Sequence, residues 1–168
     1  MKKKLLTLIF TGIGMTNFAQ AQNSPLQDAP VINLRQQIAL VQKQMSECVN
    51  QDKMSDAAKV VNEEVFEIVP KSVHKENLFL SKNTITDEES AALISYLDTS
   101  HQCRVISSQF PVPDLKNIYA SFYKQVDLVY AELLSKKITI GEANKEKYQL
   151  IQTAQSQWLN YASENKVN

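Results

Sequence analysis

Glycine is almost absent from this chain, and this scarcity limits the folds that the chain can adopt. The 168 residues include three glycines, and two of them, Gly12 and Gly14, lie in an apolar N-terminal run. Only Gly141 serves the rest of the chain. Sheets joined by many tight turns rely on glycine for backbone conformations with positive φ, so a β-sandwich or a β-barrel is disfavoured. The scarcity of glycine favours helices.

Apolar residues recur at helical spacing through most of the chain. From Val31 to Cys48 the steps are three and four residues, which predicts a helix from about Asp28 or Pro30 to Asn50. Similar patterns predict four further helices, at about residues 56–69, 87–108, 113–134 and 140–164. The expected fold is all-α: a single-domain bundle of four to five helices.

Local signals mark the starts of three of these helices. Thr86 and Glu89 form one capping box, and Thr139 and Glu142 form another, because a hydroxyl and a carboxylate three residues apart satisfy each other's backbone N–H. Pro113 suits the first turn of the helix between them. These positions fix the expected boundaries best.

Two segments leave more than one interpretation open. Ser55 can cap the helix at 56–69, but the alternation over residues 64–69 also fits a strand. In the helix at 87–108, Tyr96 and Cys103 lie on one apolar stripe, whereas Ile94 and Val105 lie on the opposite side. A helix that is apolar on two faces is expected to be sandwiched between others.

The N-terminus has the pattern of a bacterial secretory signal peptide. Lys2, Lys3 and Lys4 precede an apolar run that ends at Met15, and an A-x-A motif ends at Ala21. The run is shorter than the roughly 20 residues that span a membrane, so cleavage after Ala21 is expected rather than anchoring. The protein is therefore predicted to be periplasmic or secreted. The expected parts are a signal peptide (1–21), a flexible leader (22–30), a helical bundle domain (31–163) and a disordered tail (164–168).

Charge and glycine content exclude several function classes. The chain has 18 basic and 18 acidic residues, and cleavage would remove three lysines and no acid, leaving a net charge of −3. A chain with this net charge lacks the excess of positive charge that is typical of nucleic-acid-binding proteins. Loops that hold phosphates need several glycines, so nucleotide cofactors are not expected either. No cofactor is predicted.

The two cysteines, Cys48 and Cys103, are predicted to form a disulfide. Both lie on core stripes of different helices, and an exported chain meets an oxidising compartment. The alternatives are a metal site or a catalytic thiol that also uses His74 or His101. Residues two apart on a helix are separated by about 200°, so His101 and Cys103 point to opposite sides, and no metal site is expected.

Aromatic residues gather in the last third of the chain. On the helix at 113–134, Tyr123, Tyr130 and Leu134 lie to the side of the apolar stripe centred on Phe122. They are expected to rim the core or to form a contact surface for a partner, and they are the candidate partner-binding residues. His101 is expected to pack between its neighbours with a hydrogen bond.

The leading functional hypothesis is a non-catalytic exported protein that binds another protein, as an inhibitor, an immunity protein or a chaperone does. One alternative is a periplasmic hydrolase whose residues, such as Glu63, Glu67 and His74, meet only in three dimensions. Another is a carrier of a lipid or small ligand, which predicts a large apolar cavity. Otherwise the acidic clusters are expected to lie on solvated faces and at helix starts.

Overall fold

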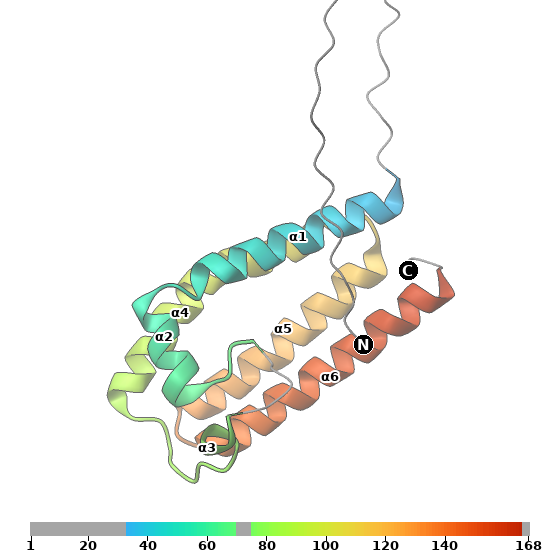
Figure 1. The fold of residues 1–168 in the computed structure, drawn as a ribbon. Helices are drawn as coiled ribbons and strands as arrows, with labels where there is room; N and C mark the ends of the chain where they lie inside the picture. The colour runs from blue at the N-terminus through green and yellow to red at the C-terminus, as the bar shows by residue number, and fades with distance from the viewer. Residues whose placement is uncertain (1–32, 70–74, 166–168) are drawn as a thin grey trace, which may run out of the picture. The chain divides into compact units, whose positions relative to one another are not determined.

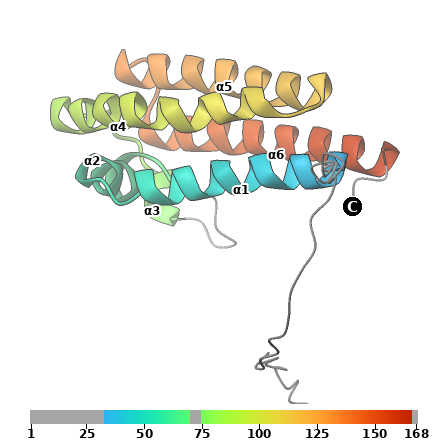
Figure 2. The same cartoon turned by 90° about the horizontal axis from the view of Figure 1, so that it is seen from above.

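Four long helices form the body of the protein. The computed structural model describes residues 33–69 and 75–165, in which there are helices and connecting segments but no β-strand. The long helices run side by side, and each points opposite to the one before it (Figures 1 and 2). They are α1 (Leu34–Asp52), α4 (Asp87–Val105), α5 (Pro113–Leu134) and α6 (Ile140–Glu164). The predicted all-α class is confirmed.

Two short helices complete the set of six α-helices in the described residues. The α2 helix (Asp56–Val60) continues directly into a π-helical turn (Val61–Val65). The α3 helix (Glu76–Phe79) lies in a connector for which no helix was expected, and a 3-10 turn (Ile106–Gln109) extends α4.

The start of α1 differs from the expected one. The helix begins at Leu34, because the side chain of Asn33 accepts a hydrogen bond from the Gln36 backbone while the Gln36 side chain bonds the Asn33 backbone. The expectation of a start near residues 28–30 is wrong. Asparagine followed three residues later by glutamine is a capping box, so the signal was present in the sequence.

The second helix ends earlier than expected. A helix that continues to residue 69 is wrong, and so is the alternative of a strand, because the backbone leaves the π-helical turn after Val65. The side chain of Asn144, from α6, explains the ending: its Nδ2 donates to the Val65 carbonyl at 2.7 Å, and its Oδ1 accepts from the Glu67 backbone at 3.2 Å. These bonds satisfy backbone groups that a continued helix would pair internally.

The α4 helix is buried on one side only. Leu93 and Cys103 are buried, but Ile94 and Val105 are each 51% exposed. The expectation of a helix sandwiched on two faces is therefore wrong. In the described residues α4 packs mainly on α1, on α2 and on the π-helical turn that follows α2.

The α5 and α6 helices form an antiparallel hairpin that supplies a large share of the core. Its buried residues belong to two separate apolar clusters along the bundle. The larger cluster includes Val61, Phe66, Leu93, Val126, Tyr130, Leu133 and Ala143. The smaller one includes Ile38, Val41, Phe110, Leu115 and Tyr161.

Gly141 lies where the start of α6 meets the segment before α4. Its backbone N–H donates to the Ser81 carbonyl at 3.1 Å, and the N–H of Ile140 donates to the Asn83 carbonyl at 2.9 Å. A Cβ at position 141 would lie 2.4 Å from that Ser81 oxygen. The glycine is required for the close approach of two backbones.

The predicted disulfide between Cys48 and Cys103 is confirmed. It joins α1 to α4 with a Cα–Cα distance of 5.5 Å. Because both sulfur atoms are used in this bond, neither cysteine serves as a metal ligand or as a catalytic thiol in this structure.

The predicted signal peptide and leader lie outside the described residues, and so do residues 166–168 of the predicted tail. Glu164, expected to begin the tail, is the last residue of α6. None of the described helices is both long enough and apolar enough to cross a membrane.

Replacing Gly141 with alanine is expected to destabilise the fold. Alanine improves helix propensity by about 1 kcal/mol, but the new Cβ would collide with a backbone oxygen that cannot move without breaking the contact. Overpacking of this kind costs about 1–3 kcal/mol, so a lower midpoint in urea denaturation is expected. Ser156→Ala, at an exposed position of the same helix, is the control. A Gly141→Ala variant as stable as the parent would contradict the close approach.

Loss of the disulfide is expected to destabilise the protein strongly. The bond closes a loop with a sequence separation of 55 residues. On the chain-entropy model, closing a loop of this length raises the free energy of unfolding by about 4 kcal/mol. The Cys48→Ala/Cys103→Ala double variant and the reduced parent should show the same large fall in the free energy of unfolding. A fall below about 1 kcal/mol in both would show that α1 is held by packing instead.

Candidate functional site

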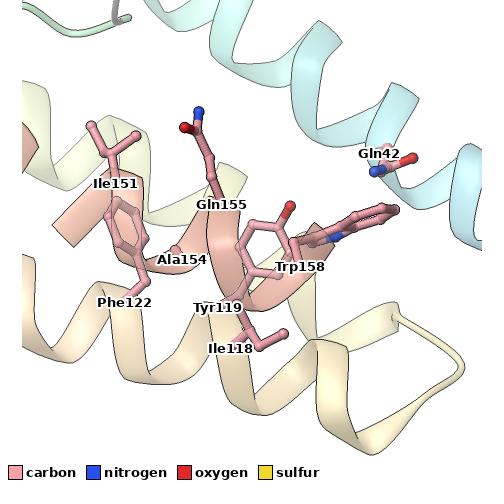
Figure 3. A pocket seen from close by; sticks show the side chains of 8 residues that line it. All are labelled: Gln42, Ile118, Tyr119, Phe122, Ile151, Ala154, Gln155 and Trp158. Carbon is pink, nitrogen blue, oxygen red and sulfur yellow. The ribbon is translucent and has the colours of Figure 1, made fainter. Parts of the chain in front are cut away.

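An apolar groove lies between α1 on one side and the α5–α6 hairpin on the other (Figure 3). Its volume is about 230 Å³. It is lined by Gln42 of α1, by Ile118, Tyr119 and Phe122 of α5, and by Ile151, Ala154, Gln155 and Trp158 of α6. We call this set the aromatic groove.

Trp158 is the only tryptophan of the chain and closes one end of the aromatic groove (Figure 3). Its indole Nε1 is buried and has no hydrogen-bond partner among the described residues. Buried polar atoms nearly always have a partner, because a missing one costs about 1–3 kcal/mol. The unsatisfied donor is a feature that a bound acceptor would relieve.

A second space, the interior cavity, adjoins the aromatic groove and has a volume of about 250 Å³. The two spaces share three lining residues: Phe122, Ile151 and Gln155. The other residues that line the cavity are Val49, Asp52, Ile68, Tyr96, Ser100, Cys103, Arg104, Tyr123, Val126, Tyr130 and Lys147. The cavity thus lies beside the disulfide and combines aromatic walls with charged groups.

Arg104 extends from α4 into the wall of the interior cavity. Its guanidinium lies over the rings of Tyr123 and Tyr130, with centroid distances of 5.2 and 5.8 Å, and its Nη1 forms an ion pair with Asp127. The Arg104 side chain is 18% exposed, whereas that of Asp127 is 56% exposed. The aromatic contacts therefore fix the guanidinium on the protein side, and Asp127 faces water.

Lys147 of α6 is the other cation of the interior cavity, and it is buried. Its Nζ donates to the Glu67 carbonyl oxygen at 2.7 Å and lies 5.3 Å from the centroid of the Phe66 ring. Burial lowers the pKa of Lys147 to about 8; Glu67 raises it in part, and Arg104 lowers it further. The ammonium form still predominates at neutral pH.

Three tyrosines complete the polar lining of the cavity. Burial raises the pKa values of Tyr96 and Tyr123 to about 12, and that of Tyr130 higher still. Neighbouring negative charges add to this effect, and Arg104 opposes it. The hydroxyls therefore remain protonated at neutral pH and keep their ability to donate hydrogen bonds.

Of the three predicted partner-binding residues, Tyr123 and Tyr130 both line the interior cavity, and Leu134 does not. Tyr123 is half-buried and lines the interior cavity, while Leu134 is half-buried against the larger core cluster. Tyr130 is 5% exposed and belongs to the larger core cluster, so of the two alternatives it follows the one in which it lies at the core. Its ring packs against that of Phe66, with ring centroids 5.0 Å apart.

The residues suggested for other chemistry do not converge. His101 is exposed, opposite to buried Cys103 as expected, but the expectation that it packs between its neighbours is wrong. Glu63 is exposed and Glu67 is buried, and His74 lies outside the described residues. The described ranges contain no group of three or more histidine, cysteine, aspartate or glutamate residues placed to hold a metal ion.

Sequence reasoning missed Trp158 as a lining residue of the aromatic groove and Lys147 as a lining residue of the interior cavity. A signal for Lys147 was present, because it lies four residues after Ala143 and four before Ile151, on the face of α6 that points inward. A charged residue on an otherwise apolar stripe predicts a buried charge with specific partners.

Comparison with protein-family models, curated proteins and solved structures finds no match to the chain.

Burial of Lys147 predicts a change of stability with pH. The folded pKa of about 8 is below the ordinary 10.5, so between these values the unfolded chain binds more protons and stability rises with pH. The Lys147→Met variant lacks this group. From pH 8 to 10 the parent should therefore gain roughly 2 kcal/mol of unfolding free energy relative to the variant, at about 1.4 kcal/mol per pH unit.

The comparison of parent and variant at each pH removes the effect of the tyrosines. Their raised pKa values make stability fall as pH rises above the ordinary 10, and they do so in both proteins. Urea denaturation at several pH values gives the difference. A difference that does not change between pH 8 and 10 would show that Lys147 is solvated.

Proposed function

We propose that this protein is exported and acts without catalysis, by binding another protein in the aromatic groove. Two features support export: the signal-peptide pattern of residues 1–21 and the Cys48–Cys103 disulfide, a bond that persists in oxidising compartments. The proposed location is the periplasm or the medium. Inhibitor, immunity and chaperone-like action all fit this proposal.

The observation that carries the proposal is the apolar lining of the aromatic groove. Phe122, Tyr119 and Trp158 offer ring surfaces, and Ile118 and Ile151 offer aliphatic surfaces, from two adjacent helices. Grooves of this kind between helices take the apolar face of a partner's amphipathic segment. Buried aromatic and aliphatic anchors supply most of the binding energy in such interfaces.

Polar groups at the groove suit a polypeptide occupant. Gln42 and Gln155 face the groove from α1 and α6 (Figure 3). Each amide has both donors and an acceptor, as a backbone does. The unsatisfied Trp158 Nε1 is a further donor, for which a backbone carbonyl is a suitable acceptor.

Site-specific photocrosslinking in the producing cell tests this proposal. A photoreactive residue replaces Gln42 or Gln155 in the groove, and Gln149, which is exposed on α6 and outside the groove, is the matched control. Adducts with one protein of defined mass are expected from both groove positions and not from the control. The mass of that protein identifies the partner and separates the three kinds of action.

The affinity of the purified partner for the aromatic groove can then be measured directly. Trp158 is the only tryptophan, so a shift of its fluorescence on titration reports occupation of the groove when the partner fragment lacks tryptophan. Replacing Ala154 in the groove floor with leucine should weaken binding at least tenfold, or about 1.4 kcal/mol, by filling the space. Equal crosslinking at all three positions, or unchanged affinity of Ala154→Leu, would contradict the proposal.

A further inference from the structure

We propose that the aromatic groove and the interior cavity form one slot that binds a single-chain amphiphile with an uncharged, hydroxylated head, as in a monoacylglycerol. The acyl chain lies in the groove and the head lies in the cavity. This ligand goes beyond the proposed protein partner and does not depend on it. The titrations below contain no partner, so either proposal can fail without the other.

The slot lies between two pairs of helices. Among the long helices, close packing joins α1 to α4 and α5 to α6. The aromatic groove and the interior cavity both lie between α1 and the α5–α6 hairpin, and they share Phe122, Ile151 and Gln155. The shared residues make the two spaces neighbours along the direction of the helices, so a linear ligand can occupy both.

The length of the slot matches one acyl chain. Along α1 the lining residues extend from Gln42 in the groove to Asp52 in the cavity, and along α6, which points the opposite way, from Trp158 to Lys147. At a rise of about 1.5 Å per residue, these stretches measure about 15 and 17 Å. The hydrocarbon core of a bilayer is about 30 Å thick and holds two chains end to end, so one chain extends about 15 Å. A ligand the size of one ring would leave most of this length empty.

The groove end of the slot suits a hydrocarbon chain. Its lining is almost entirely apolar, with ring surfaces from Tyr119, Phe122 and Trp158 and aliphatic surfaces from Ile118 and Ile151. Burying one methylene group against such a surface favours binding by about fourfold. The groove and the cavity have volumes of about 230 and 250 Å³. Together they fall within the range of about 300–1,000 Å³ that is usual for small-molecule sites.

The charges at the cavity end are balanced, which favours an uncharged head. Arg104 forms its ion pair with Asp127, the charge of Glu67 attracts Lys147, and half-buried Asp52 lines the same space. A carboxylate head would lose its hydration and find both cations already paired. An ammonium head would meet the same two cations and be repelled by them.

Hydroxyl groups suit the polar atoms that remain, because a hydroxyl both donates and accepts hydrogen bonds. The hydroxyls of Tyr96 and Tyr123 stay protonated at neutral pH and are donors in the cavity. The carboxylate of Asp52 and the amide oxygen of Gln155 are acceptors. A glycerol ester has two hydroxyls and a carbonyl, so it can bond with both kinds of group.

Titration of the exported, disulfide-bonded protein with lauroylglycerol, below the concentration at which this lipid aggregates, tests the slot. Fluorescence of Trp158, the only tryptophan, reports binding. A dissociation constant below about 10 μM is expected. Butyrylglycerol, with the same head and a chain eight methylene groups shorter, should bind at least hundredfold more weakly. Laurate, with the same chain and a charged head, should bind at least tenfold more weakly. No binding of lauroylglycerol, or equal binding of either comparison probe, would overturn the proposal.

Filling the groove should shorten the chain that fits. Ala154→Leu enlarges a side chain of the groove lining, on the way from the cavity to Trp158. This variant should bind octanoylglycerol as the parent does and lauroylglycerol at least tenfold more weakly. Ser156→Leu, at an exposed position of the same helix, is the matched control and should keep the affinity of the parent for both lipids. An Ala154→Leu variant that binds lauroylglycerol as tightly as the parent does would overturn the placing of the chain in the groove.

The direction of the chain is tested in the parent protein, so the result does not depend on the folding of a variant. Bromine quenches tryptophan fluorescence only at close range. Because Trp158 lies at the groove end, lauroylglycerol brominated at the terminal carbon should quench it more strongly than the same ester brominated next to the carbonyl. Equal quenching by the two esters, or stronger quenching by the second, would overturn the placing of the head in the cavity.

Discussion

The covalent bond between Cys48 and Cys103 holds α1 against α4, and the aromatic groove and the interior cavity both depend on that constraint because α1 lines each of them. Of the 19 residues of α1, only Ile38 and Val41 are buried. The same helix supplies Gln42 to the aromatic groove, so part of its inner face borders the groove and not packed side chains. A helix with few packed side chains gains less dispersion energy from its neighbours, and the disulfide offsets this smaller gain.

Buried polar groups of α6 form a second constraint, on the other side of the cavity. Asn144 and Lys147 bond the backbone of residues 65–67, and in doing so they end the π-helical turn and fix the wall of the cavity. A buried charge is a poor source of stability, because desolvation opposes the attraction to its partners. The lowered pKa of Lys147 expresses that cost. The attraction between Lys147 and Glu67, which raises the lysine pKa in part, offsets a share of this cost.

The predictable features of this fold are those that local spacing encodes. The apolar stripes that carry Cys48 and Cys103 are properties of short stretches of sequence, and the glycine content is a property of composition. Together they led to the correct fold class, and the stripes led to the correct disulfide. The end of the second helix at Val65 was not predictable in this way, because its cause is Asn144, 79 residues further along the chain. The exposed side of α4 and the surroundings of Lys147 depend in the same manner on which helices become neighbours.

The residues between the two core clusters show how the space arises. Along α6, Ala154 and Gln155 lie between Leu150 of the larger cluster and Tyr161 of the smaller one, and Gln42 faces them from α1. One small and two polar side chains cannot fill the volume that larger aliphatic residues would occupy. Filling such space is among the commonest ways to stabilise a protein, and it would close the groove and narrow the cavity. The composition at these three positions therefore favours access over packing, and access is what a binding site requires.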